Sequence, residues 1–196
     1  MSEHEGCGCC AAKAVDGPRR KIIQIAVAGL VAPGASIAAA AEAAQGPAAG
    51  DLLVEEDAEG APKLLAPADL PLGKPMLAFP FDAKAKAARD GTRLNKVMLI
   101  RFAEDGLDAA TKARAAGGVL AFSALCTHQA CDVKTWLAKE QAAVCFCHAS
   151  KFKLLEGGAV SAGPATKALP TLPLKLEGGQ LVVAGGFSAA PGGTAS

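Results

Sequence analysis

Four residues that can bind metal ions lie in two short motifs in the second half of the chain. The first motif is Cys126-Thr127-His128, and the second, which follows a gap of sixteen residues, is Cys145-Phe146-Cys147-His148. Each motif places one thiolate and one imidazole on a tight loop, and two such loops facing each other can enclose two metal ions. We therefore predict a metal site whose ligands are Cys126, His128, Cys145 and His148.

The donor set favours a [2Fe–2S] cluster with mixed ligands. Thiolates suit ferric iron and sulfide, and two neutral imidazoles remove negative charge from one iron, which raises the reduction potential. Such clusters have potentials of about −150 to +300 mV, against about −400 mV for plant-type clusters with cysteine ligands only. Zinc is the first alternative, but zinc ribbons and fingers use other spacings. A framework of disulfide bonds alone is the second, and it gives the two histidines no role.

Two further cysteines, Cys131 and Cys147, lie within a few residues of the predicted ligands, one in each motif. In an oxidising compartment they can pair and tie the two loops together. Such a crosslink would hold the loops closed beside the cluster and leave the imidazole edges exposed.

Two stretches around the predicted ligands resemble the cluster-binding boxes of Rieske proteins: C-T-H-Q-A-C at residues 126–131 and C-F-C-H-A-S at residues 145–150. The similar proteins are the Rieske subunits of cytochrome bc and b6f complexes and the small subunit of arsenite-oxidase-like molybdoenzymes. G-P-A-T, which begins with Gly163 and Pro164, resembles the proline-rich loop that covers the cluster in this family. The resemblance extends over about residues 119–183.

The resemblance implies one [2Fe–2S] cluster and a role for each matching residue. Cys126 and Cys145 would bind the buried iron, and His128 and His148 the outer iron. Ser150 would donate a hydroxyl hydrogen bond to a bridging sulfide.

Three positions depart from the family pattern. Gln129-Ala130 stands where proteins of bc complexes usually have Leu-Gly near the quinone-docking surface, and Phe146 replaces the usual proline. Phe152 stands where members of high potential have a tyrosine that donates to a ligand cysteine, here Cys145. These departures weaken the link to quinol and predict a lower potential.

The family implies a subunit that transfers single electrons and is not a stand-alone catalyst. The first hypothesis is the iron–sulfur subunit of a bc-type quinol–cytochrome c oxidoreductase, with cytochrome b- and c-type subunits as partners and quinol as a further candidate. The alternative is an electron-transfer subunit of another periplasmic oxidoreductase, such as an arsenite-oxidase-like molybdoenzyme with its large subunit as partner. A Rieske oxygenase needs a mononuclear iron held by two histidines and a carboxylate. Beyond the predicted ligands the chain offers only His4, so that class is excluded for this chain alone.

The first 44 residues resemble an export signal. Residues 1–21 are polar and end in Arg19-Arg20-Lys21, and an apolar segment over residues 22–44 follows. A twin arginine before a weakly hydrophobic run is typical of the bacterial Tat route, which predicts a periplasmic protein. The segment is either cleaved, with Ala41-Glu42-Ala43 as one candidate site, or retained as a membrane anchor. Cys7, Cys9 and Cys10 in the polar tail are interpreted as reduced thiols.

The rest of the chain predicts an all-β domain over residues 66–190, joined by a linker over residues 45–65 and followed by a disordered tail over residues 191–196. Short apolar runs punctuated by glycine and proline predict strands over residues 96–102, 119–122, 143–146, 152–155, 169–176 and 180–183. Strong helix formers predict a short helix within residues 108–116. The family resemblance implies an antiparallel β base with an inserted cluster-binding subdomain.

Composition bounds the partners. The chain has 196 residues and a formal net charge of +1, and aromatic residues make up only 4%. A nucleic-acid partner would need a basic face, and no cluster of lysine and arginine interleaved with aromatic residues occurs. We therefore expect protein partners and no nucleic acid.

Overall fold

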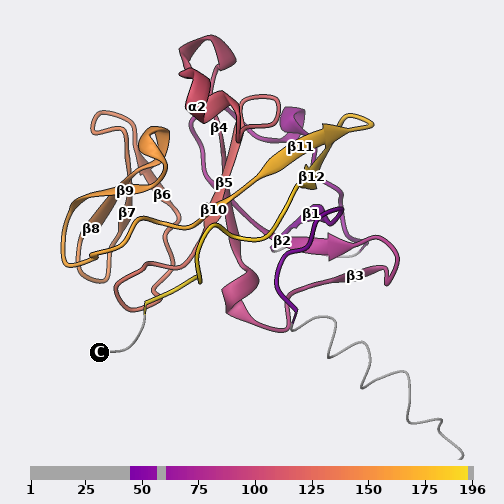
Figure 1. The fold of residues 1–196 in the computed structure, drawn as a ribbon, viewed down its shortest axis with the longest axis horizontal. Helices are drawn as coiled ribbons and strands as arrows, with labels where there is room; N and C mark the ends of the chain where they lie inside the picture. The colour runs from indigo at the N-terminus through magenta and orange to yellow at the C-terminus, as the bar shows by residue number, and fades with distance from the viewer. Residues whose placement is uncertain (1–44, 57–60, 194–196) are drawn as a thin grey trace, which may run out of the picture. The chain divides into compact units, whose positions relative to one another are not determined.

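The structure is a computed structural model that describes residues 45–56 and 61–193 (Figure 1). These residues belong to the second of two compact units of the chain, Pro33–Ser196. The polar tail, its three cysteines and the export or anchor segment of residues 22–44 lie outside the described residues. Within the described ranges, no helix is long and apolar enough to cross a membrane.

An antiparallel sheet of eight strands, here called the base sheet, forms the larger part of the domain. Seven of its strands run in the order β10-β5-β4-β2-β1-β12-β11, and β3 pairs with β2. The strands are β1 (Leu52–Glu55), β2 (Met76–Asp82), β3 (Ala87–Ala88), β4 (Val97–Arg101), β5 (Val119–Ser123), β10 (Thr171–Leu172), β11 (Leu174–Glu177) and β12 (Gln180–Val183).

A second antiparallel sheet, here called the small sheet, is inserted in the chain between β5 and β10. Its four strands are β6 (Thr135–Leu137), β7 (Ala142–Cys145), β8 (Ser150–Lys153) and β9 (Ala159–Ala162), paired in chain order. Figure 1 shows this orange sheet beside the base sheet. The predicted all-β fold, an antiparallel base with an inserted subdomain, is confirmed.

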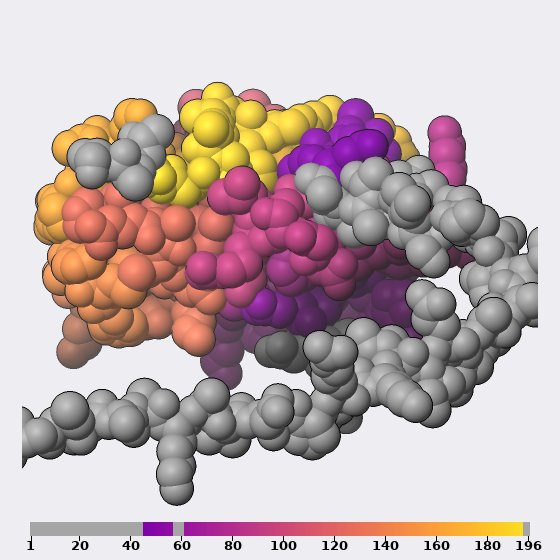
Figure 2. Space-filling view, turned by 90° about the horizontal axis from the view of Figure 1, so that it is seen from below, coloured from indigo at the N-terminus to yellow at the C-terminus, as the bar shows by residue number. Residues whose placement is uncertain are grey.

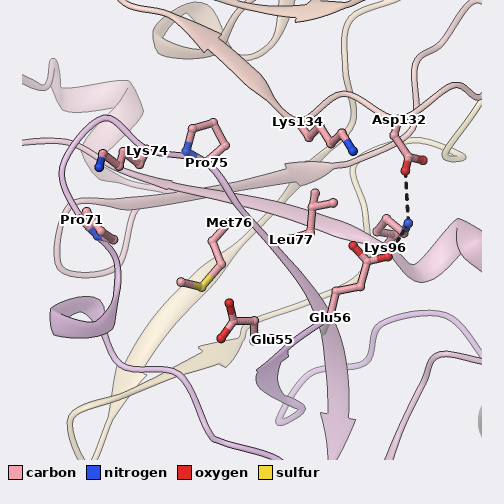
Figure 3. Close-up of a pocket in the computed structure, with 10 residues that line it drawn as sticks. All are labelled: Glu55, Glu56, Pro71, Lys74, Pro75, Met76, Leu77, Lys96, Asp132 and Lys134. Carbon is pink, nitrogen blue, oxygen red and sulfur yellow. Dashed lines mark hydrogen bonds and ion pairs between the residues drawn. The ribbon is translucent and has the colours of Figure 1, made fainter. Parts of the chain in front are cut away.

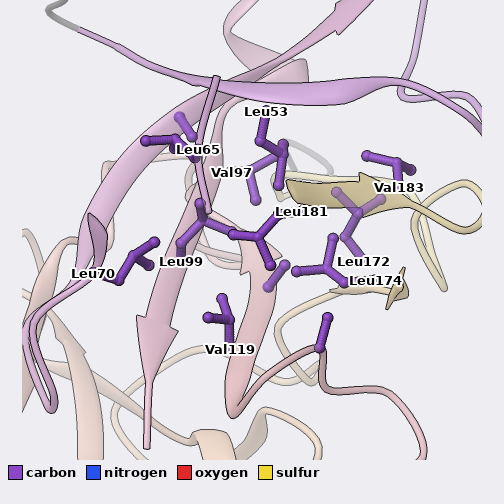
Figure 4. Packing of buried hydrophobic residues seen from close by; sticks show 13 residues of the cluster. Leu53, Leu65, Leu70, Val97, Leu99, Val119, Leu172, Leu174, Leu181 and Val183 are labelled. Carbon is purple, nitrogen blue, oxygen red and sulfur yellow. The ribbon is translucent and has the colours of Figure 1, made fainter. Parts of the chain in front are cut away.

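Two apolar cores share the central strands of the base sheet. Side chains alternate between the two faces of a strand, so Val97 and Leu99 of β4 enter one core while Met98 and Ile100 enter the other. Figure 4 shows the first core, between the strands of the base sheet. The second core also contains residues of the small sheet, including Phe152. Because β4 and β5 are buried on both faces, they read as continuous apolar runs.

Within residues 45–56 and 61–193, helical structure is confined to single turns. The predicted helix within residues 108–116 is α2 (Ala109–Lys112), and the Asp108 side chain caps it by accepting a hydrogen bond from Thr111 N (2.8 Å). Four 3₁₀ turns complete the described elements: η1 (Pro67–Asp69), η2 (Arg93–Asn95), η3 (Glu104–Gly106) and η4 (Leu154–Glu156).

The predicted linker over residues 45–65 is wrong at residues 52–55, which form a strand of the base sheet. Strand β1 lies between β2 and β12 in the base sheet, and Leu53 is fully buried. Just before it, the buried Asp51 carboxylate accepts a hydrogen bond from Arg89 Nε (2.8 Å). The strand is only four residues long, its pairing partners lie far away in the sequence, and glycines and acidic residues surround it. The local sequence therefore gives no clear strand pattern.

The prediction also missed β2, β3, β6 and β9. In β2, Pro80 interrupts the apolar run, and a proline inside a run argues against a strand because it cannot donate to the ladder. Here the Pro80 carbonyl accepts a hydrogen bond from Arg89 N (2.7 Å), so this position bonds through its oxygen alone.

Candidate metal centre

Two tight loops carry the predicted ligands. The first follows β5 and is closed by hydrogen bonds from Cys126 N to Cys131 O (2.8 Å) and from Ala130 N to Cys126 O (2.9 Å). The second joins β7 to β8 and is closed by the pairing of Cys145 with Ser150. Each loop has an alanine with positive φ, Ala130 at 53° and Ala149 at 59°. This conformation is unfavourable for L-residues, so contacts with the surrounding structure must stabilise it in both loops.

The structure brings the four predicted ligands together as two pairs. Cys126 and Cys145 are free thiols, each 1% exposed. His128 Nδ1 lies 3.2 Å from His148 Nδ1, and the two rings meet edge to face. Two nitrogens bound to one tetrahedral ion at about 2.1 Å would lie about 3.4 Å apart. The imidazole nitrogens therefore converge as ligands of a single ion would.

The buried thiols also suit metal ligation. Burial raises the pKa of the Cys145 thiol, and its contact with the Cys126 thiol raises it further. Two adjacent thiolates in such a place need a compensating cation, because an isolated buried charge is very unfavourable. Two buried thiols beside two converging imidazoles are the donor set of a mixed-ligand [2Fe–2S] cluster, so the residues present fit this group.

A disulfide bond between Cys131 and Cys147 joins the two loops, with the Cα atoms 6.5 Å apart. The sulfur atoms of both residues lie within 4.8 Å of Cys145 Sγ. Because the disulfide uses two of these three sulfurs, only Cys145 remains free to bind metal.

A third segment covers the site and contains the predicted Gly163 and Pro164. Gly163 has φ of +84°, and a Cβ there would lie 2.6 Å from Ser150 N. The buried Ser150 hydroxyl accepts a hydrogen bond from Ala165 N (3.1 Å), which leaves its own hydrogen for another acceptor. Pro164 is exposed. The segment passes so close to the second loop that only glycine fits at its start.

Phe152 is fully buried in the same core as Cys126 and Cys145. Its ring therefore fills the space below the ligand loops and contributes no hydrogen-bond donor.

Sequence reasoning missed Thr127, which lies between two ligands. Its hydroxyl donates to the carbonyl of Lys167 (2.7 Å), so the first loop is also tied to the covering segment. A threonine in a loop gives no signal for a partner forty residues away, and only the folded arrangement shows it.

It also missed a network of charges that fixes the first loop to the base sheet. Asp132 accepts hydrogen bonds from Arg93 Nη2 (2.7 Å) and Lys96 Nζ (3.3 Å), and Lys96 also pairs with Glu56 (2.5 Å). Burial alone would lower the pKa of Lys96, but the two carboxylates outweigh it and raise that pKa. Burial would raise the pKa of Asp132, but hydrogen bonds from Arg93 and Lys96 lower it. Asp132 directly follows Cys131 in the sequence, so the charge network and the disulfide bond hold neighbouring residues of the first loop.

Glu56, Lys96 and Asp132 of this network line a cavity of about 520 Å³ beside β2 (Figure 3). Its walls carry three carboxylates and three ammonium groups, contributed by Glu55, Glu56, Asp132, Lys74, Lys96 and Lys134. The balance of charge gives it no preference for an anion or a cation.

The outer edge of the site is exposed to solvent. His148 is exposed and His128 is partly buried. Beside them Phe146 is 74% exposed, and Gln129 is also exposed. This edge is the part of the site that a partner can touch.

The predicted disordered tail of residues 191–196 is wrong for its first three residues. Residues 191–193 are described and partly buried, while residues 194–196 lie outside the described part of the chain. A Cβ at Gly193 would lie 2.9 Å from Thr127 O and even closer to the carbonyl of His128, so this segment packs on the first ligand loop.

Comparison with known proteins matches residues 86–173 to the Rieske [2Fe–2S] domain. The chain is 31% identical over 127 residues to the cytochrome bc1 complex Rieske iron–sulfur subunit of Streptomyces lividans, covering 63% of this chain and 75% of that one. It is 35% identical over 125 residues to a Haloferax mediterranei protein named as the Rieske subunit of a respiratory nitrate reductase, covering 62% and 53%. It is 36% identical over 99 residues to the bc1 Rieske subunit of Corynebacterium diphtheriae, covering 47% and 24%. The chain thus spans about half of the nitrate reductase relative and about a quarter of the last one.

Solved structures give weaker matches. The ferredoxin of carbazole 1,9a-dioxygenase from Nocardioides aromaticivorans is 20% identical with a TM-score of 0.44, over 69% of this chain and 98% of that one. The soluble domain of Rieske protein II from Sulfolobus acidocaldarius is 21% identical with a TM-score of 0.36, over 72% of each.

The converging donor atoms, the family match and the similarity to the Streptomyces protein lead to the same assignment. The chain belongs to the Rieske [2Fe–2S] proteins: it binds one [2Fe–2S] cluster and takes part in electron transport.

Proposed function

We propose that this chain is the iron–sulfur subunit of a bc-type quinol–cytochrome c oxidoreductase and passes single electrons from quinol to a c-type cytochrome. The observation that carries the proposal is the convergence of the His128 and His148 Nδ1 atoms (3.2 Å) at an exposed edge above two buried thiols. In this arrangement Cys126 and Cys145 would hold the inner iron of a bound cluster, and the two histidines would hold the outer iron.

The bound cluster supplies a one-electron redox couple. The chain supplies the surroundings of that couple. Phe152 and the apolar core exclude water from the cysteine side. The disulfide joins the two loops, and the segment of residues 163–167 contacts both of them, through Gly163 and Ala165 at the second loop and Lys167 at the first. We expect these contacts to limit rearrangement when the charge of the site changes.

His148 is the residue through which a quinol would reach the site. Its Nδ1 atom faces His128, so Nε2, on the other side of the ring, faces outward from an exposed side chain. There Nε2 can accept a hydrogen bond from a quinol hydroxyl and hold its proton. Phe146, two residues before it in the sequence and 74% exposed, offers an apolar contact for a partner surface at the same edge.

The relatives support this assignment. The Streptomyces and Corynebacterium proteins are named as Rieske subunits of cytochrome bc1 complexes. We extend to this chain the partners that such a complex has, cytochrome b- and c-type subunits.

Location in the bacterial periplasm belongs to the same proposal and rests on the sequence. The twin arginine at Arg19-Arg20 and the apolar segment of residues 22–44 support export by the Tat route, with that segment as a tether to the inner membrane. Changing both arginines to lysine should leave cluster-loaded protein in the cytoplasm, as cell fractionation would show. Normal periplasmic delivery of the double variant would count against this route.

A second function, electron transfer within another periplasmic oxidoreductase such as a molybdoenzyme, is favoured by two observations. Gln129 replaces the leucine that bc-complex proteins present near the quinone, and one relative is named as a subunit of a nitrate reductase. This function needs no quinol contact at His148.

Reduction by quinol of the complex purified from membranes distinguishes the two functions. For a bc-type subunit, quinol should reduce the cluster, and Phe146→Ala should slow that reduction while cluster content and potential stay unchanged. Lys175→Ala, which removes an exposed ion pair with Glu177 in β11 of the base sheet, is the control. Co-purification with a molybdenum cofactor and no reduction by quinol would favour the second function.

A further inference from the structure

The chain continues beyond β12 as a segment without regular structure, residues 185–193, here called the strap. The strap lies outside the region matched to the Rieske domain, which ends at residue 173. In Figure 1 it runs in yellow from β12 past β10 toward the inserted region. Figure 2 shows the same yellow segment against the salmon surface that contains the first ligand loop.

The first half of the strap is fixed to the base sheet. Ser188 N donates to Thr171 O, and Thr171 N donates to the Ser188 hydroxyl, both at 2.9 Å. Next to it, the partly buried Phe187 ring packs on the core of the base sheet. These contacts tie the strap to β10 before it reaches the site.

The second half of the strap reaches the backbone of the first ligand loop. A Cβ at Gly193 would lie 2.5 Å from the carbonyl carbon of His128, and one at Gly192 would lie 3.3 Å from Ala130 Cβ. Between the strap and the loops a cavity of about 150 Å³ is lined by Thr127, Lys167 and strap residues. The end of the strap therefore rests on the loop itself, and at Gly193 the space admits no side chain.

We propose that the strap is a positioning element that keeps His128 in place by closing the backbone side of its loop. This proposal rests on the assignment of His128 as a cluster ligand. The second loop has the short β7–β8 connection and the Ser150 contact to hold it. At the first loop, the strap lies directly against the carbonyl of His128. Without it, the loop would open more often, and cluster loss follows the population of the open state.

The chain offers a matched pair of variants within the strap. Gly193 lacks a positive φ, so Gly193→Ala acts through its clash with the His128 carbonyl. Gly186 also lacks a positive φ, and a Cβ there meets only Pro47 O at 3.8 Å. Gly186→Ala therefore changes the same residue type in the same segment and leaves the loop alone. A chain that stops after Ala190 removes the contact without introducing a clash.

The experiment uses the full-length, cluster-loaded protein with these changes. Gly193→Ala and the shortened chain should lose the cluster to a chelator about five- to tenfold faster than the parent protein, and Gly186→Ala should match the parent. The hyperfine couplings of the histidine nitrogens in the reduced state should change in the first two proteins, a signature that a purely structural role in the base sheet would not produce. His128→Ala is measured alongside to test the ligand assignment.

Parent-like rates and couplings in Gly193→Ala or in the shortened chain would overturn the proposal, as would an equal effect of Gly186→Ala. In those cases loss of the cluster in His128→Ala would still leave the ligand assignment intact. A cluster retained in His128→Ala would instead remove the assignment on which the strap proposal rests.

Discussion

The base sheet and the ligand loops of the inserted region are stabilised by different kinds of contact. In the base sheet, four consecutive residues of β4 are fully buried, and neighbouring strands pack leucine and valine around them. In the two ligand loops, the only large apolar side chain, Phe146, is exposed. A disulfide, hydrogen bonds to backbone atoms and the charges around Asp132 hold those loops.

This difference has a consequence for how each part tolerates change. Apolar burial is non-directional and roughly proportional to area, so the base sheet can accept many side chains of similar volume. Hydrogen bonds and covalent links depend on direction and distance, so the loops depend on particular residues. Variants in the base sheet should therefore change stability, while variants in the loops should change the cluster.

The largest expected effect is complete loss of the cluster. Cys145→Ser or His148→Ala removes a donor from the site, while the base sheet keeps its apolar contacts and should remain folded. Iron and acid-labile sulfide should be present in equal amounts in the parent protein and absent from both variants, with unchanged far-ultraviolet circular dichroism. Gln129→Ala, on the same exposed edge, is the control. One zinc per chain and no sulfide in the parent protein would contradict the assignment.

The opposite pattern is expected for Leu99→Ala in the base sheet. The side chain is fully buried, so its truncation should reduce the free energy of unfolding by about 2–5 kcal/mol. Leu72→Ala, at a side chain that is 61% exposed, should have little effect. Denaturant unfolding measures both, and the cluster potential of the folded protein should not move. A shift of potential in Leu99→Ala would show that the two regions are not separable in this way.

The disulfide provides the next largest effect. Changing Cys131 and Cys147 together to serine avoids leaving a free thiol near Cys145. The bond closes a loop with a sequence separation of 16, which corresponds to a stabilisation of about 3 kcal/mol. The cluster should still assemble but be lost faster, which absorbance under oxygen would follow. A lifetime equal to that of the parent would mean that the ligands alone hold the loops.

The charge network should have a smaller, pH-dependent effect. Asp132→Asn leaves Lys96 with Glu56 alone and should destabilise the first loop by about 1–2 kcal/mol. Because the pKa of Asp132 is lowered in the folded protein, its contribution is present above the unfolded value of about 3.9 and disappears as pH falls through the folded value. The parent should therefore lose this advantage over the variant in acid denaturation below about pH 4. Glu140→Gln, in the more exposed pair with Lys151, should change stability by less than about 0.5 kcal/mol.

The smallest effect concerns the reduction potential. Phe152→Tyr should add a donor near Cys145, and Ser150→Ala should remove one, because hydrogen bonds to sulfur strengthen as the cluster gains an electron. A bond at the low end of about 1.5–3 kcal/mol corresponds to some tens of millivolts for one electron, since about 59 mV equals 1.4 kcal/mol. Voltammetry should show a rise for Phe152→Tyr and a fall for Ser150→Ala. An unchanged potential in fully loaded Phe152→Tyr would show that the position serves packing alone.

The sequence predicts these two regions unequally. The ligands, the all-β class and strands β4, β5 and β12 follow from local spacing and apolar runs. Strand β1 and the contact of Gly193 with His128 do not, because each depends on a partner distant in the sequence. The same is true of Lys96 and Asp132, since a single charged residue gives no sign of where its partner lies. The ligands lie in short motifs that can be recognised locally, whereas the residues that hold the ligand loops in place are distributed along the chain.

The pairing of β5 with β10 has a consequence for how this protein can change. Phe122 pairs with Thr171, and Ser123 N donates to Pro170 O (2.8 Å), so the chain leaves the base sheet and returns to it at one place. Whatever lies between these two points can grow, shrink or be exchanged without altering the register of the base sheet, because lengthening a loop adds little closure entropy. The inserted region that carries the ligand loops can therefore be exchanged as a unit. The redox properties of the protein can evolve in this way while the strand pairing of the base sheet is conserved.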